Sequence, residues 1–175
     1  YDPNIYPNQP NVVVIHGQLN IALITEFYNC TILMDQGASF RIGNNEELVL
    51  INSTVQSFCG AMWEGIFCDD GSRFKIRQNT LIRDAHYGVH MSGSVSMDFW
   101  QNARMLNCFY GIYTPPSASG NTPFMAGAVP GQDLVITHNA NLLPAFYGQN
   151  PVPQTGSYAG VFFNDVASFT TLSPN

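Results

Sequence analysis

Charged side chains are scarce in this chain. Only 10% of its 175 residues are Asp, Glu, Lys or Arg, whereas an ordinary soluble domain has about a quarter. Six Lys and Arg stand against twelve Asp and Glu, so the chain has no basic stripe and we predict no nucleic-acid partner. A surface so poor in charge must be covered by Asn, Gln, Ser, Thr and Gly, which is typical of secreted or assembly-forming β proteins.

Long apolar runs and metal-ligand spacings are missing as well. The longest apolar run, Val12 to Ile15, is only strand-sized, so we predict no membrane span. No stretch of ten residues has a helical hydrophobic period. The four cysteines form no CxxC pair, and the four histidines show no metal-ligand spacing, so we predict no metal site and no cofactor. Cys59 and Cys68 are close enough in sequence for a disulfide, and four buried free thiols are an equal alternative.

A repeat of 23 residues is the main feature that the chain does have. The segment RQNTLIRDAHYGVHMSGSV, Arg77 to Val95, returns 23 positions later as WQNARMLNCFYGIYTPPSA. One glycine marks each unit, and these are Gly65, Gly88, Gly111, Gly148 and Gly160. A second landmark is an asparagine near each β-prone run, and these are Asn29, Asn52, Asn79, Asn102 and Asn139. A fixed period of about 20 to 50 residues indicates a solenoid, a propeller or an array.

The content of each unit favours one of these architectures. About three short β-prone segments alternate with single Gly, Asn, Asp or Ser residues, which suits one coil of a β-helix. We therefore predict an all-β, single-stranded, right-handed parallel β-helix of about six coils, whose main chains pair from coil to coil. Residues 1–11 form an extended N-terminal arm, and residues 12–175 form the β-helix domain with loop insertions at 115–131 and 149–157. The residue after each repeat glycine points inward, as in Ile66, Val89, Ile112 and Val161.

The segment Asn29 to Ile66 carries a family resemblance. Its "NCTI" strand start, its "GASFRI" turn and strand, and "LVLINST" followed by "MWEGI" resemble the right-handed parallel β-helix repeats of large secreted and cell-surface proteins of Bacteroidetes-type bacteria, within the pectin-lyase-like superfold. The resemblance covers most of residues 30–111. It implies export and an extracellular or cell-surface location, but it implies no particular activity, because this fold supports lyases, hydrolases, adhesins and passive scaffolds.

Acidic residues offer little for an enzyme. A glycan-cleaving site needs clustered carboxylates, and the best local candidates are Asp69 and Asp70, with Arg73 and Lys75 close behind. Adjacent strand residues point to opposite faces, so the two acids converge only in a turn, and an acidic solvated turn is the stronger interpretation. The repeat alignment pairs Asp98 with Lys75 on an outer face. We predict that the protein is not an enzyme, and we assign no catalytic residue.

Aromatic residues make up 13% of the chain. One column of the repeat contains three tyrosines, Tyr87, Tyr110 and Tyr147. If this column faces outward, it can contact sugar rings or another subunit; the alternative is that the rings pack beneath the inserted loops. In the same alignment His86 falls beside Phe109, which indicates a packing position, and His90 is expected to point outward.

Three functions are compatible with these patterns. The leading one is a secreted structural protein that forms a homo-oligomer or homopolymer, an extracellular filament or surface layer, through its coil ends and its N-terminal arm. The alternative is a carbohydrate-binding or adhesive module with a glycan partner, which uses the tyrosine column and the loop at 115–131. A polysaccharide lyase or glycoside hydrolase is the least favoured, because no acids cluster in the alignment.

Overall fold

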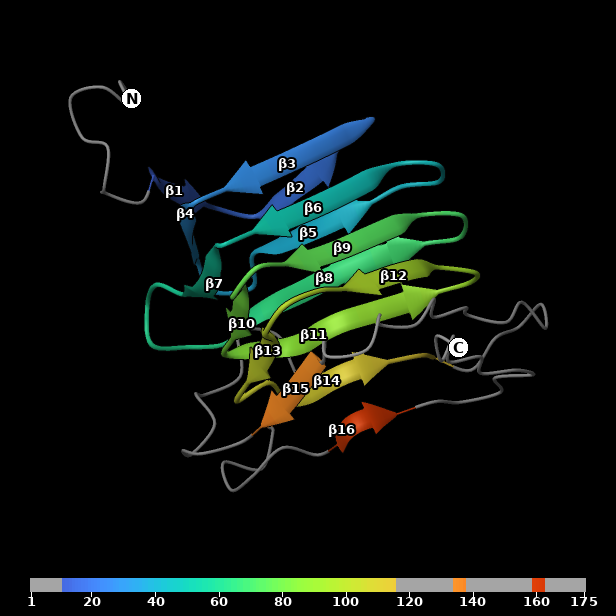
Figure 1. Ribbon diagram of the computed structural model, residues 1–175. Helices are drawn as coiled ribbons and strands as arrows, with labels where there is room; N and C mark the ends of the chain where they lie inside the picture. Colours follow the sequence, from blue (N-terminus) through green and yellow to red (C-terminus); the bar gives the residue numbers. More distant parts are fainter. Residues whose placement is uncertain (1–10, 116–133, 138–158, 163–175) are drawn as a thin grey trace.

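A computed structural model describes residues 11–115, 134–137 and 159–162 of the protein, and they wind into a parallel β-solenoid (Figure 1). The strands are β1 (Asn11–Ile15), β2 (Gln18–Ile21), β3 (Ile24–Tyr28), β4 (Cys30–Met34), β5 (Ser39–Ile42), β6 (Glu47–Ile51), β7 (Thr54–Ser57), β8 (Trp63–Asp69), β9 (Arg73–Arg77), β10 (Leu81–Arg83), β11 (Ala85–Ser92), β12 (Ser96–Phe99), β13 (Ala103–Leu106), β14 (Tyr110–Tyr113), β15 (Leu134–Thr137) and β16 (Ala159–Phe162). The described residues contain no helix. The predicted all-β parallel β-helix is therefore confirmed.

Three parallel sheets form the walls of the solenoid. Sheet A runs β1-β4-β7-β10-β13-β15, sheet B runs β2-β5-β8-β11-β14-β16, and sheet C runs β3-β6-β9-β12. Each complete coil contributes one strand to each sheet, and Figure 1 shows the strands of successive coils side by side down the stack. Four coils are complete in the described residues, and β13 to β16 extend sheets A and B into two more. The expected number was about six.

Alternation along each strand explains why the coils stack. In β4 the side chains of Cys30, Ile32 and Met34 are buried, while the intervening Thr31 and Leu33 are only partly covered. The same period of two sends apolar residues from all three sheets into one central core. Because no coil can bury this face alone, each stabilises the coil above and below it through ladder hydrogen bonds and apolar contacts.

Residues with a left-handed backbone conformation form the corner between sheets C and A. This corner follows β3, β6, β9 and β12 in the successive coils. Here Asn29 and Asn52 have positive φ angles of 52° and 46°, and Asn79 and Asn102 have 58° and 64°. Asparagine tolerates the left-handed region of backbone φ and ψ angles better than most residues. The Asn52 amide donates to Asn29 Oδ1 at 3.4 Å, and the Asn102 amide donates to Asn79 Oδ1 at 3.0 Å. Within the described residues the asparagine ladder therefore consists of two pairs.

An additional residue lengthens this corner halfway down the stack. Gln78 and Gln101 also have positive φ angles, of 46° and 49°, and each directly precedes the corner asparagine of its coil. The two later corners therefore turn through two consecutive left-handed residues, where the two earlier corners use one. Strand pairing continues on both sides of the corner, so the extra residue is absorbed by the corner alone.

A β-bulge separates the first repeat glycine from the others. Tyr110 pairs with Tyr87 on one side and with Ala159 on the other. This register places Gly88, Gly111 and Gly160 in one column. Gly65, however, pairs with Tyr87, because the register between β8 and β11 shifts after this position. Gly65 therefore lies outside the column that the 23-residue period predicts for it.

Some predicted features lie outside the described residues. They are residues 1–10 of the N-terminal arm, the loop insertions beyond residue 115, Asn139, Tyr147 and Gly148. Asn11, the last residue assigned to the arm, begins β1. Within the described part of the chain, no helix is long and apolar enough to cross a membrane.

Candidate functional site

One column of side chains crosses the outer face of sheet B from coil to coil. Strand pairing places Asn20 beside Arg41, Arg41 beside Phe67, Phe67 beside His90, and His90 beside Tyr113. These positions alternate with buried ones along their strands, so their side chains point away from the core. The column changes from polar in the first two coils to aromatic from the third coil onward. We call this surface, together with the neighbouring side chains described below, the sheet B face.

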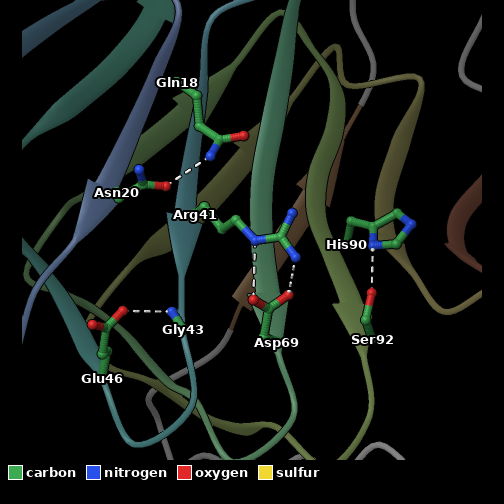
Figure 2. A network of polar contacts seen from close by, with 8 residues as sticks. All are labelled: Gln18, Asn20, Arg41, Gly43, Glu46, Asp69, His90 and Ser92. Atoms are coloured by element: carbon green, nitrogen blue, oxygen red, sulfur yellow. Dashed lines mark hydrogen bonds and ion pairs between the residues drawn. The ribbon is translucent and has the colours of Figure 1, made fainter.

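An ion pair links the polar and aromatic parts of the sheet B face. Arg41 Nε donates to Asp69 Oδ2 at 3.0 Å, and Arg41 Nη2 donates to Asp69 Oδ1 at 2.9 Å. Figure 2 shows this bidentate pair between Asn20 on one side and His90 on the other. Gln18 donates to Asn20 at 2.7 Å, so β2 of the first coil contributes a hydrogen-bonded amide pair to the same surface.

The aromatic part is a set of rings stacked between coils. Tyr87 and Tyr110 lie parallel, with ring centroids 5.4 Å apart and an interplanar angle of 11°. The His90 ring lies 4.9 Å from Phe67 and 5.2 Å from Tyr113, measured between centroids. Two of the three predicted ladder tyrosines are thus brought together, and the strand partner that follows Tyr110 is Ala159. In this stack, the facing surfaces of the Tyr87 and Tyr110 rings cover each other.

Burial keeps the ionisable rings of this cluster uncharged. Burial lowers the pKa of His86 to about 4, with a further contribution from the nearby His90. Burial also lowers the pKa of His90 to about 4. The pKa of Tyr87 is raised to about 12, chiefly by burial and then by the adjacent tyrosines. At neutral pH the cluster therefore consists of neutral imidazoles and phenols, which suits contact with an uncharged ligand.

The histidines occupy the two positions that the repeat alignment predicts. His86 is buried, and its ring lies 5.0 Å from that of Phe109, centroid to centroid. His90 lies on the outward face, where its Nδ1 is 3.3 Å from the hydroxyl of Ser92 (Figure 2). His16 is instead at the corner between sheets A and B, where its Nδ1 lies 2.8 Å from Asp35 Oδ2.

The two adjacent acids take separate structural partners. Asp69 ends β8 and binds Arg41, whereas Asp70 accepts a hydrogen bond from the backbone N–H of Ser94 at 2.7 Å. Gly71 follows with a φ angle of 73°, which confirms the predicted turn. Each carboxylate is therefore oriented by a different neighbouring coil.

The predicted partner of Asp98 is wrong, although its register is right. Asp98 does pair in register with Lys75, but Lys75 Nζ binds Glu47 Oε1 at 2.7 Å. Asp98 instead lies 3.8 Å from Arg77 and accepts a hydrogen bond from the Trp100 indole. Lys75 lies between two coils that each offer a carboxylate. It binds the nearly buried Glu47 of β6, on the opposite side of β9 from Asp98.

All four cysteines are free thiols. The disulfide considered for Cys59 and Cys68 is not formed, since Cys59 is exposed and Cys68 is in the core. The Cys59 thiol donates to Asp35 Oδ1 at 2.6 Å. This bond, and then the one from His16, lowers the pKa of Asp35 to about 2. Burial raises the pKa of Cys108 to about 12. The described residues contain no cluster of His, Cys, Asp or Glu able to hold a metal ion.

Sequence reasoning missed the polar residues of the sheet B face. Arg41 lies 21 positions after its strand partner Asn20 and 26 positions before its partner Phe67. Neither offset equals the 23-residue period, so a fixed-period alignment cannot place these residues together. The signal that does identify them is the alternation of outward residues within β5 and β8.

Comparison with known proteins gives no further identification. The chain matches no family model, no curated protein and no solved structure. The structure shows a parallel β-solenoid, and the resemblance to secreted Bacteroidetes-type β-helix proteins stays a prediction.

Proposed function

We propose that the protein is a carbohydrate-binding module and that the sheet B face is its binding surface. One observation carries the proposal: a single column that spans five coils, from Asn20 to Tyr113, changes from polar side chains in its first two coils to aromatic rings in the next three. Sugars present apolar C–H surfaces and many hydroxyl groups, so a surface with both kinds of partner suits them. The direction of the column favours an extended oligosaccharide that lies across the coils.

Binding fits this surface better than catalysis does. Glycoside hydrolysis requires two carboxylates held together across the scissile bond. On the sheet B face, Asp69 is bound by Arg41, and the neighbouring Asp70 is bound by a backbone amide. We therefore retain the expectation of a protein without enzymatic activity. The low charge of the chain and the resemblance of its repeats to secreted β-helix regions support an extracellular or cell-surface location.

Calorimetry with a panel of soluble polysaccharides tests this function. We expect Phe67→Ala and Tyr87→Ala to weaken binding by about tenfold, because stacked or edge contacts with one aromatic ring contribute about 1 kcal/mol or more. Tyr28→Ala is the matched control, since Tyr28 is an exposed aromatic residue on sheet C, and it should bind as the unmodified protein does. Absence of binding to every glycan in the panel would contradict the proposal, as would equal losses in all three variants.

Self-assembly is a second candidate function, and one observation favours it. Apolar side chains are exposed on the first coil, where β1, β2 and β3 end their sheets within the described residues. These residues are Val12, Val14, Leu23, Ile24 and Tyr28. Exposed apolar patches beside unpaired strand edges favour addition of another coil. A second copy of the chain that stacks on this end would start a filament.

Sedimentation velocity over a range of protein concentrations tests self-assembly. If the first coil is the contact, larger species should appear as the concentration rises, and a Leu23→Lys/Ile24→Lys variant should abolish them. The side chain of Leu23 is 82% exposed, so these substitutions leave the core intact. A single monomeric species at every concentration would remove this candidate without affecting glycan binding.

A further inference from the structure

The ion pair at the centre of the sheet B face bears on which glycans the face accepts. We infer that Asp69 makes the face selective for neutral glycans, by holding the charge of Arg41 so that it does not bind the carboxylates of acidic sugars. This inference rests on the proposed carbohydrate-binding function and adds the class of ligand. It assigns to Asp69 the role of a residue that determines specificity.

Arg41 is the one basic side chain on this sheet. The chain has six Lys and Arg in total, and the other five lie on β9, β10 and β13, which belong to sheets C and A. Arg41 sits in the column between Asn20 and Phe67, where the polar part of the face meets the aromatic part. A ligand that spans both parts must therefore pass over its guanidinium group.

Asp69 already occupies the fork of Arg41 that a sugar carboxylate would use. The two parallel N–H···O bonds, at 3.0 and 2.9 Å, have the bidentate geometry in which arginine binds carboxylates most strongly. A uronate group would have to displace Asp69 and leave that carboxylate without its partner. The pair is reachable by a ligand, since the side chains of Arg41 and Asp69 are 50% and 30% exposed.

The remaining charge on the face also disfavours acidic ligands. Glu64 follows the buried Trp63 in β8 and therefore points outward, and it lies close enough to Tyr87 to raise the pKa of that phenol, after burial and the neighbouring tyrosines. With Arg41 and Asp69 cancelling each other, Glu64 leaves this part of the face negative. The whole chain has a net charge of −6, which repels a polyanion at long range.

Neutral sugars meet no such obstacle. A guanidinium group has five N–H donors, and the ion pair with Asp69 uses two of them. Hydroxyl groups of a neutral sugar need only a donor or an acceptor nearby, and they bring no charge that competes with Asp69. The aromatic part of the face adds the uncharged rings of Phe67 and Tyr87.

The test compares Asp69→Asn with Asp98→Asn, using two matched ligands. Asn at position 69 keeps the shape of the side chain but releases the charge of Arg41. Asp98→Asn makes the same change in net charge and removes the carboxylate next to Arg77 on sheet C. The ligands are polygalacturonate and its fully methyl-esterified form, which share a backbone and differ in charge. A panel of neutral β-glucan, xylan and galactomannan identifies the neutral glycan that the unmodified protein binds best.

We expect the unmodified protein to bind a neutral glycan and not polygalacturonate. Asp69→Asn should gain affinity for polygalacturonate of about tenfold or more, because a charge-assisted bidentate bond becomes available, and the gain should fall as salt is added. Asp98→Asn should show no gain, and Arg41→Gln/Asp69→Asn should lose it.

The possible failures can be told apart. If the unmodified protein binds a neutral glycan but Asp69→Asn gains nothing for polygalacturonate, the inference is overturned and the proposed function stands. Equal gains in Asp69→Asn and Asp98→Asn also overturn it, since net charge alone would then explain the effect. Binding of neither neutral nor acidic glycans by the unmodified protein overturns the proposed function and the inference together. Asp69→Ser provides the same comparison if the thermal midpoint of Asp69→Asn shows that it does not fold.

Discussion

The outer faces of sheets B and C are both built from parallel strands stacked coil on coil, but their side chains differ in chemistry. On sheet C, β9 places Arg73, Lys75 and Arg77 at alternate positions, and Glu47 lies 2.7 Å from Lys75 and 3.3 Å from Arg73. Arg77 lies over the ring of Trp100, 5.3 Å from its centroid. On sheet B the corresponding columns contain stacked rings and a single bidentate ion pair.

The difference shows what a stacked coil requires of its outward side chains. Main-chain pairing brings equivalent positions of neighbouring coils together, so each column must hold side chains that tolerate their neighbours. Charged columns achieve this by alternating the sign of the charge, which leaves little net charge for a ligand. Aromatic columns achieve it by stacking, and their rings carry no charge at neutral pH. This difference is the reason that we propose the sheet B face, and not the outer face of sheet C, as the binding surface.

The largest expected effect concerns the bulge between β8 and β11 of sheet B. Gly65 has a φ angle of 139°, and a Cβ atom there would overlap the carbonyl oxygen of Tyr87. We expect Gly65→Val to destabilise the protein by about 3 kcal/mol or more in chemical denaturation, from strain and backbone overlap. Gly60→Asn is the control, because an added Cβ at Gly60 meets no atom within 4 Å and Asn tolerates positive φ. Equal effects of the two substitutions would show that the bulge is not strained.

The next effect compares the ion pairs of the two faces. Glu47 is nearly buried, with 7% of its side chain exposed, so Glu47→Gln leaves two cations without their acceptor and should cost about 2 kcal/mol. The pair on the sheet B face is far more exposed, so Asp69→Asn should cost about 0–1 kcal/mol. Denaturation curves of both variants provide the measurement. A larger loss in Asp69→Asn would reverse the roles that we assign to the two faces.

A smaller effect comes from ring stacking. Aromatic pairs contribute about 0.5–1.5 kcal/mol beyond the burial of their area, so a double-mutant cycle of Tyr87→Ala and Tyr110→Ala should give a coupling free energy in this range. Tyr28→Ala on sheet C should change stability by at most about 0.5 kcal/mol, because Tyr28 is an exposed surface residue. A coupling free energy of zero between Tyr87 and Tyr110 would mean that their parallel arrangement adds nothing to stability.

The last expected effect is a loss of folding stability in acid, which comes from His86 and His90 and is absent at neutral pH. The folded-state pKa values of His86 and His90, about 4, lie below their ordinary value of 6.5. Between these values the unfolded chain binds more protons than the folded one. The contribution of the two histidines to the free energy of unfolding is therefore full above about pH 6.5 and falls as the pH drops toward 4. A His86→Phe/His90→Phe variant should lose this slope in a series of urea midpoints. Asp35, whose pKa is lowered to about 2, affects the free energy of unfolding only below about pH 4.

The sequence predicted well wherever the 23-residue period is kept. Tyr87 and Tyr110 are 23 positions apart and stack as strand partners, and the hydrogen-bonded corner pair Asn79 and Asn102 has the same spacing. In these coils the number of residues per turn is constant, so alignment of the sequence with itself gives the spatial neighbours directly.

Prediction failed where corners change length. The partners of Arg41 on β2 and β8 lie at offsets of 21 and 26 residues, and the ion pair of Arg41 with Asp69 spans 28 positions. Corner length does not enter a fixed-period alignment, so the centre of the candidate site could not be seen in it. The partner of Lys75 was missed for the same reason, since Glu47 is 28 positions away.

The bends of the solenoid are uncoupled from its walls. Tyr110 still pairs with Ala159, although 49 positions separate them, whereas Tyr87 reaches Tyr110 in 23. New sequence added at a bend therefore leaves the paired strands where they were. Evolution or an engineer can exchange peptide segments at these points, and so alter what surrounds the sheet B face, without redesigning the interior that holds the molecule together.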